Sequence, residues 1–164
     1  MPDTEPSLRE ATPDDLPAIC GLGEAVNALH HEAWPQVFAE PGDPLRHAAH
    51  WRQSIAAEQA TVFVVERAGQ VIGFVTVGLQ QDNHLLLQPT RYARIGSISV
   101  APACQGQGLG RRLMQAAEAW ARQRGAPDIR LNVWAFNQRA LALYEELGYE
   151  VRSQVLGKRL TFNR

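Results

Sequence analysis

Between Ser99 and Gly125 the chain passes from an apolar, strand-like stretch through three alternating glycines directly into an amphipathic helix. The glycines are Gly106, Gly108 and Gly110, in the string QGQGLG. A glycine inside a helix costs about 1 kcal/mol relative to alanine, so a helix that starts on glycines needs a compensating gain there. This strand, loop and helix constrain the fold more than any other feature of the sequence.

The glycine loop has the properties of an anion site. The first amides of a helix lack partners within it, and the helix dipole adds partial positive charge at the same end, so a helix start binds phosphate readily. Glycines would let a large anion approach the amides of residues 105–111. The apolar residues that follow recur at helical spacing and predict core packing: Leu109, Leu113, Ala116, Ala117, Trp120 and Ala121. The loop, rather than this stripe, is the candidate binding site.

Three interpretations of the loop compete. A P-loop needs a lysine and then a serine or threonine after its last glycine, where Arg111 and Arg112 stand. A dinucleotide fingerprint needs a third glycine at position 111 and an acidic residue after the next strand, whereas Asp128 precedes that strand. A flexible turn without a ligand is the third interpretation, and the loop alone leaves it open.

The other elements alternate in type along the chain. Pro13 and Pro44, each behind a capping residue, predict the starts of two helices after a short strand over 7–11. Two apolar runs around RAGQ predict a hairpin, and RYARIGSISV predicts a further strand. PDIRLNVW, NQRALALYEELG and a closing hairpin around Gly157 complete the order β-α-α-β-β-β-α-β-α-β-β. This order predicts an α/β (α+β) fold with a mixed, mostly antiparallel sheet.

Composition limits the class of protein. The chain has 164 residues, of which 45% are hydrophobic, and we expect a single domain over residues 1–164. A formal net charge of -1 argues against nucleic acid or a membrane surface as a partner. MPDTEPSLREA is unlike a secretory leader, and no apolar run approaches the roughly 18 residues that cross a membrane. The distant cysteines Cys20 and Cys104 fit a reducing compartment, so we expect a cytoplasmic protein.

Two segments together resemble the GNAT superfamily of acyl-CoA N-acyltransferases. SVAPACQGQGLG matches the signature Q/R-x-x-G-x-G/A at Gln105, Gly108 and Gly110. LNVWAFNQRALALYEELGYE is similar to the second hallmark of that family, a strand followed by N-x-x-A-x-x-x-Y-x-x-x-G-[FY], which places Asn137 and Tyr144. The resemblance covers about residues 91–150 and implies the GNAT fold, a central sheet flanked by about four helices.

The resemblance also implies acetyl-CoA as the acyl donor, with no metal required. Its pyrophosphate is expected on the loop amides, and its pantetheine arm beside the strand before the loop. The residues expected to contact it are Ile98, Ser99, Val100, Gln105, Gly106, Gln107, Gly108, Leu109, Gly110, Arg111, Asn137 and Tyr144. For Arg111 the alternative is an exposed helix face without a ligand.

Tyr144 is the expected catalytic residue. The family uses its matching tyrosine beside the leaving thiolate, and a phenol of pKa about 10 can donate a proton to a thiolate of pKa about 8.5. Tyr144 follows Asn137 by seven residues, which is about two helical turns, so both residues can face one cleft. The alternatives are that Tyr144 packs in the core and that Asn137 only caps its helix.

The site expected to bind the acetyl-accepting amine has no evident general base. Many family members carry a glutamate on the strand before the loop, whereas this chain has Gly96 at or near that position. Neighbouring serines are poor bases at neutral pH, so the amine is expected to lose its proton to water or to another residue. His31 and Trp34 fall where this fold shapes the acceptor pocket, and an unperturbed histidine has a pKa of about 6.5. A solvated histidine and a core tryptophan are the alternatives.

The expected function is transfer of acetyl from acetyl-CoA to a primary amine, on a small molecule or a peptide, by direct attack in a ternary complex. A non-catalytic CoA-binding or sensor domain is the alternative, suggested by the missing carboxylate at Gly96. Binding of a nicotinamide dinucleotide is a further alternative. The sequence leaves open both the identity of the amine and the choice between a monomer and a homodimer.

Overall fold

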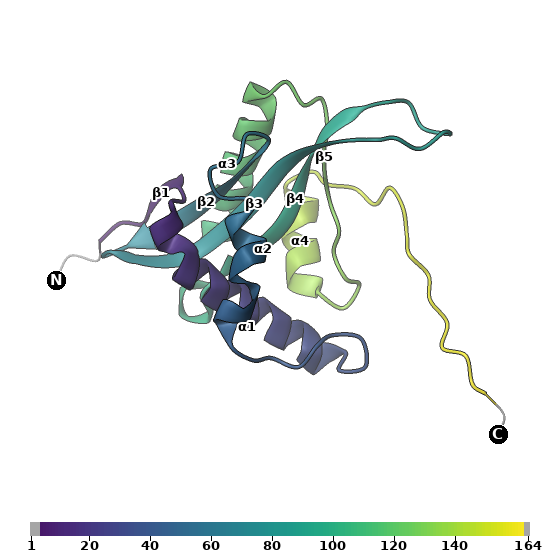
Figure 1. Ribbon diagram of the computed structural model, residues 1–164, viewed down its shortest axis with the longest axis horizontal. Coiled ribbons are helices and arrows are strands. Elements are labelled where there is room, and N and C mark those ends of the chain that lie inside the picture. Colours follow the sequence, from purple (N-terminus) through teal and green to yellow (C-terminus); the bar gives the residue numbers. More distant parts are fainter. Residues whose placement is uncertain (1–3, 163–164) are drawn as a thin grey trace.

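The computed structural model describes residues 4–162 and places a five-stranded sheet between two layers of helices (Figure 1). The strands lie side by side in chain order: β1 (Ser7–Glu10), β2 (Ala60–Arg67), β3 (Gln70–Gln81), β4 (Arg91–Val100) and β5 (Ile129–Leu131). The first four pair antiparallel, and β4 pairs with β5 in parallel. The sheet is therefore mixed and mostly antiparallel, as predicted.

Helices cover both faces of this sheet (Figure 1). One face carries α1 (Leu16–Ala33) and α2 (Ala48–Arg52), and the other carries α3 (Leu109–Gln123) and α4 (Gln138–Glu146). Short 3-10 turns precede α1, α2 and the glycine loop: Pro13–Asp15, Pro44–His47 and Pro102–Cys104. Side chains alternate along β3, so Phe74 packs under α1 while Val75 packs under α3. No helix among the described residues is both long and apolar enough to cross a membrane.

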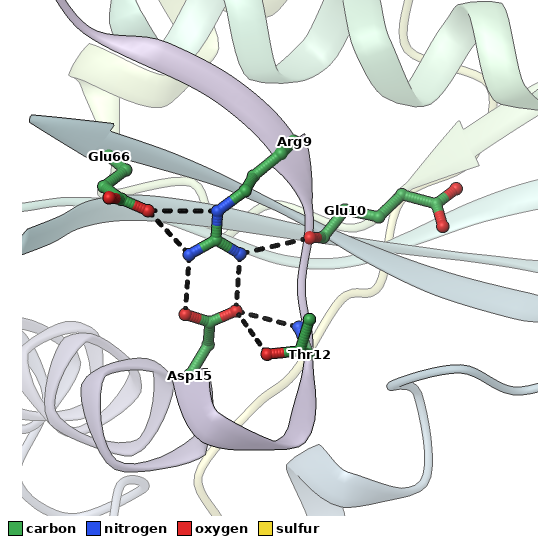
Figure 2. A network of polar contacts seen from close by, with 5 residues as sticks. All are labelled: Arg9, Glu10, Thr12, Asp15 and Glu66. Carbon is green, nitrogen blue, oxygen red and sulfur yellow. Dashed lines mark hydrogen bonds and ion pairs between the residues drawn. The ribbon is translucent and has the colours of Figure 1, made fainter. Parts of the chain in front are cut away.

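Arg9 joins β1, β2 and the start of α1 (Figure 2). Its guanidinium donates to both carboxylate oxygens of Asp15, at 2.7 and 2.9 Å, and to Glu66 Oε2 at 2.7 and 3.0 Å. Asp15 also accepts from the amide of Thr12 at 2.8 Å and so caps the turn before α1. The adjacent guanidinium lowers the pKa of the Asp15 carboxyl. These contacts fix the first turn of α1 to the sheet.

Gly23 lets α2 approach α1. A Cβ atom at position 23 would lie 2.5 Å from Cζ2 of Trp51, which is closer than carbon atoms can pack. The Trp51 ring in turn packs edge-on against Phe74, with ring centroids 5.3 Å apart. A glycine in the interior of α1 is therefore required by packing, and it holds α2 over the sheet.

The predicted closing hairpin around Gly157 is wrong. Residues 149–162 contain no strand. Tyr149 still packs against the core and Arg152 pairs with Asp128, and beyond them the chain runs away from the rest of the fold (Figure 1). Val155, Leu156 and Phe162 are 98%, 90% and 88% exposed. The physical reason lies in β5, which has three residues and offers too short an edge to pair a hairpin within the same chain.

Candidate functional site

A gap between β4 and β5 is the central feature of the site. The two strands pair only as far as Ile95 and Leu131, and residues 96–100 of β4 have no strand beside them on that side. The glycine loop and α3 follow directly from this unpaired part of β4. A strand edge inside a sheet offers N–H and C=O groups to an extended ligand.

The backbone of Ile98 and Val100 faces this gap. The amide of Ala101 donates to the carbonyl of Ile72 in the chain segment that forms β3, at 2.8 Å. In an antiparallel strand the backbone N–H and C=O groups of alternate residues point to the same neighbouring strand. Those of Ser99 therefore also point to β3, and those of Ile98 and Val100 point to the gap. Two of the three predicted strand contacts therefore lie on the gap, and Ser99 does not.

Six successive amides, from Gly106 to Arg111, donate to no acceptor within residues 4–162. The next amide, that of Arg112, donates to the Gly108 carbonyl at 3.2 Å. The amide of Gln105, which was also expected to contact the anion, donates instead to the Pro102 carbonyl at 3.4 Å. The helix start thus presents a run of unpartnered N–H groups beside the gap, which suits an anion such as pyrophosphate.

The structure requires glycine at the three loop positions for different reasons. Gly106 and Gly108 have φ of 79° and 77°, a left-handed conformation that glycine adopts without steric cost. A Cβ atom on either would meet nothing within 4 Å. At Gly110 a Cβ atom would lie 3.3 Å from Cδ2 of Leu143, so this residue allows the start of α3 to pack against α4. The three glycines were expected to share one role, whereas the structure gives Gly110 a separate one.

Two arginines that were not predicted as site residues flank the loop. Arg67, at the end of β2, donates to Oε1 of Gln107 at 2.8 Å, and Arg139, in the first turn of α4, donates to Oε1 of Gln105. Gln105 itself donates to the Val100 carbonyl at 3.1 Å and so ties the loop to β4. Both guanidinium groups add positive charge beside the unpartnered amides. Only the fold brings them there, because they are 40 and 34 residues from the glutamines they contact.

Two predicted contacts on the helices have partners within the protein. Oδ1 of Asn137 accepts from the amide of Ala140 at 3.2 Å, so this residue caps α4, as its alternative interpretation stated. Its amide nitrogen is left for other partners. Arg111 forms an exposed ion pair with Glu146 of α4.

Tyr144 projects from α4 into the core on the α3 side and is 8% exposed. Its hydroxyl forms no hydrogen bond to the described residues. Among those residues, the side-chain polar atoms that are both fully buried and without a partner are Arg67 Nε and Trp120 Nε1, and the Tyr144 oxygen is not one of them. The phenol oxygen therefore keeps contact with solvent. Burial raises the pKa of Tyr144, so its hydroxyl stays protonated at neutral pH and can donate a proton.

A threonine occupies the space beside Gly96, at or near the position where the family resemblance predicts a glutamate. Thr76 of β3 lies opposite Gly96, where the β3–β4 register shifts between Val75 and Val77. A Cβ atom on Gly96 would lie 2.6 Å from Thr76 Oγ1, and that oxygen accepts from the amide of Ser97 at 2.9 Å. No carboxylate is present at this point of the strand.

The side chain of Ser99 also has a hydrogen-bond partner within the protein. Its hydroxyl donates to the carbonyl of Leu22 in α1 at 3.1 Å, and the side chain is buried. It therefore joins β4 to α1 and is not placed to relay protons in the gap.

Aromatic rings gather where α1 ends and where the chain leaves β5. His30 and Phe38 lie 5.5 and 6.1 Å from Phe136, and Phe38 lies 4.8 Å from Trp134, measured between ring centroids. Trp34 meets Trp134 edge-on at 5.7 Å, and these two side chains are 44% and 43% exposed. Trp34 thus forms part of an accessible aromatic wall and does not fill the core.

His31 takes no part in these ring contacts. Its Nδ1 lies 2.8 Å from the carbonyl oxygen of Phe38. Since a carbonyl only accepts, Nδ1 carries the hydrogen and Nε2 carries the lone pair of the neutral ring. The structure therefore places the preceding residue, His30, in the aromatic wall in place of His31. Among residues 4–162 no three histidine, cysteine or acidic side chains gather to hold a metal ion.

Comparisons of the sequence with known proteins consistently identify acetyltransferases. The sequence pattern of the acetyltransferase (GNAT) family matches residues 24–149, which include every element from β2 to α4. An aminoglycoside N(6')-acetyltransferase type 1 from Stenotrophomonas maltophilia is 29% identical over 155 residues, 92% of this chain and 90% of that protein. A streptothricin acetyltransferase from Streptomyces lavendulae is 34% identical over 93 residues, 57% of this chain and 46% of that protein.

Solved structures share the fold. A mutant of the BH1408 protein from Bacillus halodurans is similar with a TM-score of 0.88 and 25% identity, over 94% of this chain and 99% of that one. The aminoglycoside N-acetyltransferase AAC(6')-Iy, solved in complex with CoA, has a TM-score of 0.74 and 19% identity over 98% of both chains. Both likenesses extend over nearly the whole chain.

Proposed function

Because the chain belongs to the GNAT acetyltransferase family, we propose that it transfers the acetyl group of acetyl-CoA to a primary amine by direct attack in a ternary complex. The observation that carries this proposal is the run of unpartnered amides from Gly106 to Arg111 beside the β4–β5 gap. The amides suit a pyrophosphate, and the gap suits an extended arm that pairs with Ile98 and Val100. The structural neighbour AAC(6')-Iy was solved with CoA, which supports this choice of donor.

Tyr144 acts as the general acid. The amine nitrogen attacks the carbonyl carbon of the thioester, the carbon–sulfur bond breaks, and the Tyr144 hydroxyl donates its proton to the departing sulfur. Burial favours the neutral phenol, so the donor form is populated at neutral pH. The attacking nitrogen loses one proton to water as the amide forms, and the Tyr144 phenolate regains a proton from solvent.

The amine reaches the thioester as the neutral base. With Gly96 opposite Thr76, β4 supplies no carboxylate to remove a proton from an ammonium group. Water in the gap accepts this proton, and no protein group shares the role. The alternative base is His31, whose Nε2 carries a lone pair in the neutral ring.

The acceptor lies between the aromatic wall and Gly96. Trp34 and Trp134 offer apolar, exposed ring surface on one side of the gap, and related enzymes are named for small amines such as aminoglycosides and streptothricin. The proposal therefore places a small-molecule amine here, and a peptide amine is the second candidate.

We also propose that the protein is a homodimer. Residues 153–162 extend from the fold with apolar side chains in water, which is unfavourable for an isolated chain. A second copy can cover these side chains in a symmetric interface.

Acetylation assays with acetyl-CoA and a panel of amines test the proposed reaction. We expect product with at least one amine and calorimetric binding of CoA, with no binding of a nicotinamide dinucleotide. Binding of CoA without turnover of any amine would instead support the sensor alternative. Absence of CoA binding would overturn both.

A further inference from the structure

A second feature lies on the α1–α2 face of the sheet, beside the gap. It is a cavity of about 330 Å³ between β3, β4 and the segment that follows α2. Its polar lining consists of Ser54, Gln59, Thr76, Gln80 and Arg94, and Gly96 forms part of its wall. This volume is within the range of small-molecule sites.

The cavity reaches the place where the acyl group would react. Gly96 is the first residue of β4 beyond its last pair with β5, so the cavity wall and the start of the gap share this residue. Arg94 and Gly96 point to the same face because side chains alternate along a strand, while Ile95 between them packs in the core on the α3 side. Arg94 is therefore on the opposite face from the amides at the start of α3, and it is separate from the proposed pyrophosphate site.

Arg94 has no internal counter-charge. It is half-buried, and it forms no side-chain hydrogen bond or ion pair with any described residue. By contrast, Arg9 pairs with both Asp15 and Glu66, and the guanidinium of Arg130 pairs with two aspartates. No aspartate or glutamate lines the cavity. A half-buried guanidinium without a carboxylate favours binding of an anion.

The neutral groups in the cavity are arranged as hydrogen-bond donors. Oε1 of Gln59 accepts from Arg91 at 2.7 Å, and Oε1 of Gln80 accepts from the Tyr92 hydroxyl at 3.1 Å, so both amide nitrogens remain to donate. Thr76 Oγ1 already accepts from the amide of Ser97, which leaves its hydrogen to donate. Neutral donors and one cation around a cavity complement an anion and disfavour a polycation.

We propose that this cavity binds a carboxylate on the acceptor, with Arg94 as the specificity-determining residue, so that the acceptor is an amine that also carries a carboxylate. The inference rests on the proposed function, since it assigns the acceptor class of the same site. A planar carboxylate matches the two-pronged geometry of a guanidinium. Its amine would then extend past Gly96 toward the gap.

Matched acceptors test the charge requirement. Acetylation rates are compared for amino acids and their carboxamides, together with the polycation neamine, in the unmodified protein, Arg94→Gln and Arg52→Gln. Arg52 is exposed at the end of α2 and does not line the cavity, so its variant controls for loss of one positive charge nearby. Each carboxamide keeps the amine and side chain and lacks only the negative charge.

We expect at least one amino acid to exceed its carboxamide in kcat/KM by about 10- to 100-fold, the range of a hydrogen bond to a charged group. Arg94→Gln should remove this preference, mainly through KM, and should leave the carboxamide rate unchanged. Arg52→Gln should behave like the unmodified protein. Equal or faster reaction of the carboxamides or neamine, or an equal loss on all acceptors in Arg94→Gln, would overturn the assignment.

Binding measurements separate this inference from the proposed reaction. If CoA binds but no amine is acetylated, the proposed reaction fails, and the amino acids are titrated calorimetrically into the CoA-loaded protein. Binding that is lost in Arg94→Gln and kept in Arg52→Gln would still support the carboxylate site, whereas no binding would overturn it. Thermal unfolding of both variants checks that the fold is intact.

Discussion

Thr76 Oγ1 lies 2.6 Å from the position that a Cβ atom on Gly96 would occupy. The same oxygen accepts the amide hydrogen of Ser97, so the threonine is held in place by the irregular β3–β4 pairing. A glutamate at position 96 would have to displace it. The absence of a carboxylate here therefore depends on the packing of β3 against β4 as well as on the glycine itself. The amine's proton must leave by another route.

The glycine loop gives the most direct test of the donor site. Gly108 and Gly125 have φ of 77° and 75°, and a Cβ atom on either meets nothing within 4 Å. Alanine at either position should cost a similar free energy of unfolding, about 1 to 2 kcal/mol. Only Gly108→Ala should weaken CoA binding, by at least about tenfold or 1.4 kcal/mol, because it lies among the unpartnered amides.

Calorimetric titration of CoA and thermal unfolding of both variants measure these effects. Gly125, at the far end of α3, is the matched control for the backbone cost. Equal CoA affinity in the two variants would remove the loop from the donor site. A loss of stability in one variant alone would show that their backbone costs are not matched.

Tyr144→Phe should slow acetyl transfer by about 10- to 100-fold or more, within the range of general-acid catalysis, with little change in KM or stability. The substitution keeps the buried ring against Tyr149, whose ring centroid lies 5.9 Å away, and removes only a hydroxyl without a protein partner. Turnover under saturating acetyl-CoA and acceptor measures the effect. Tyr149→Phe, which removes the hydrogen bond to Glu118, is the control on a neighbouring phenol. Unchanged turnover in Tyr144→Phe would leave this residue a core side chain only.

Local sequence patterns predicted most of this site. The helical stripe of α3, the glycine loop and Tyr144 of α4 each depend on spacing within one segment, and the structure places them on the expected elements. Arg67, Arg139 and the cavity at Arg94 were missed because they depend on contacts between strands and helices far apart in the sequence. Alternating apolar residues predicted the closing hairpin, yet alternation does not reveal whether a sheet edge is available in the same chain.

The Arg9–Asp15 pair predicts an acid-sensitive contribution to stability. The pKa of Asp15 is lowered in the folded state, so its stabilisation is present above the unfolded pKa of about 3.9 and is lost as pH falls through the lower folded value. Asp15→Asn should therefore reduce the free energy of unfolding by about 1.5 to 3 kcal/mol at pH 7. The difference from the unmodified protein should shrink below about pH 4.

Asp14→Asn is the matched control, since Asp14 is exposed in the same turn and has no ion pair among the described residues. Urea unfolding at pH 7 and at pH 3 measures both variants. An Asp15→Asn effect as small as that of Asp14→Asn would show that the contacts in Figure 2 contribute little.

Removal of residues 150–162 should convert the proposed dimer to a monomer. The apolar side chains of this segment are exposed in the single chain, so its contacts with a second copy would be lost with it. Light scattering after size-exclusion chromatography measures the mass. Val155→Asp with Leu156→Asp should act like the deletion, whereas Lys158→Asp, on the same segment, should not. A monomer in the unmodified protein would contradict the proposal.

The pH dependence of acetyl transfer decides how the amine is deprotonated. If Gly96 and Thr76 leave no side-chain base, the rate with a saturating alkylamine of pKa about 10 should keep rising beyond pH 8, because the neutral amine fraction keeps growing. A histidine base, whose ordinary pKa is about 6.5, predicts instead a plateau once its imidazole is neutral. His31→Gln removes that base, and His50→Gln, on α2, controls for a neighbouring histidine that contacts Trp51. We expect a continued rise in all three proteins, measured where product release does not limit the rate. A plateau in the unmodified protein that disappears only in His31→Gln, together with a strong loss of rate, would assign the base to His31.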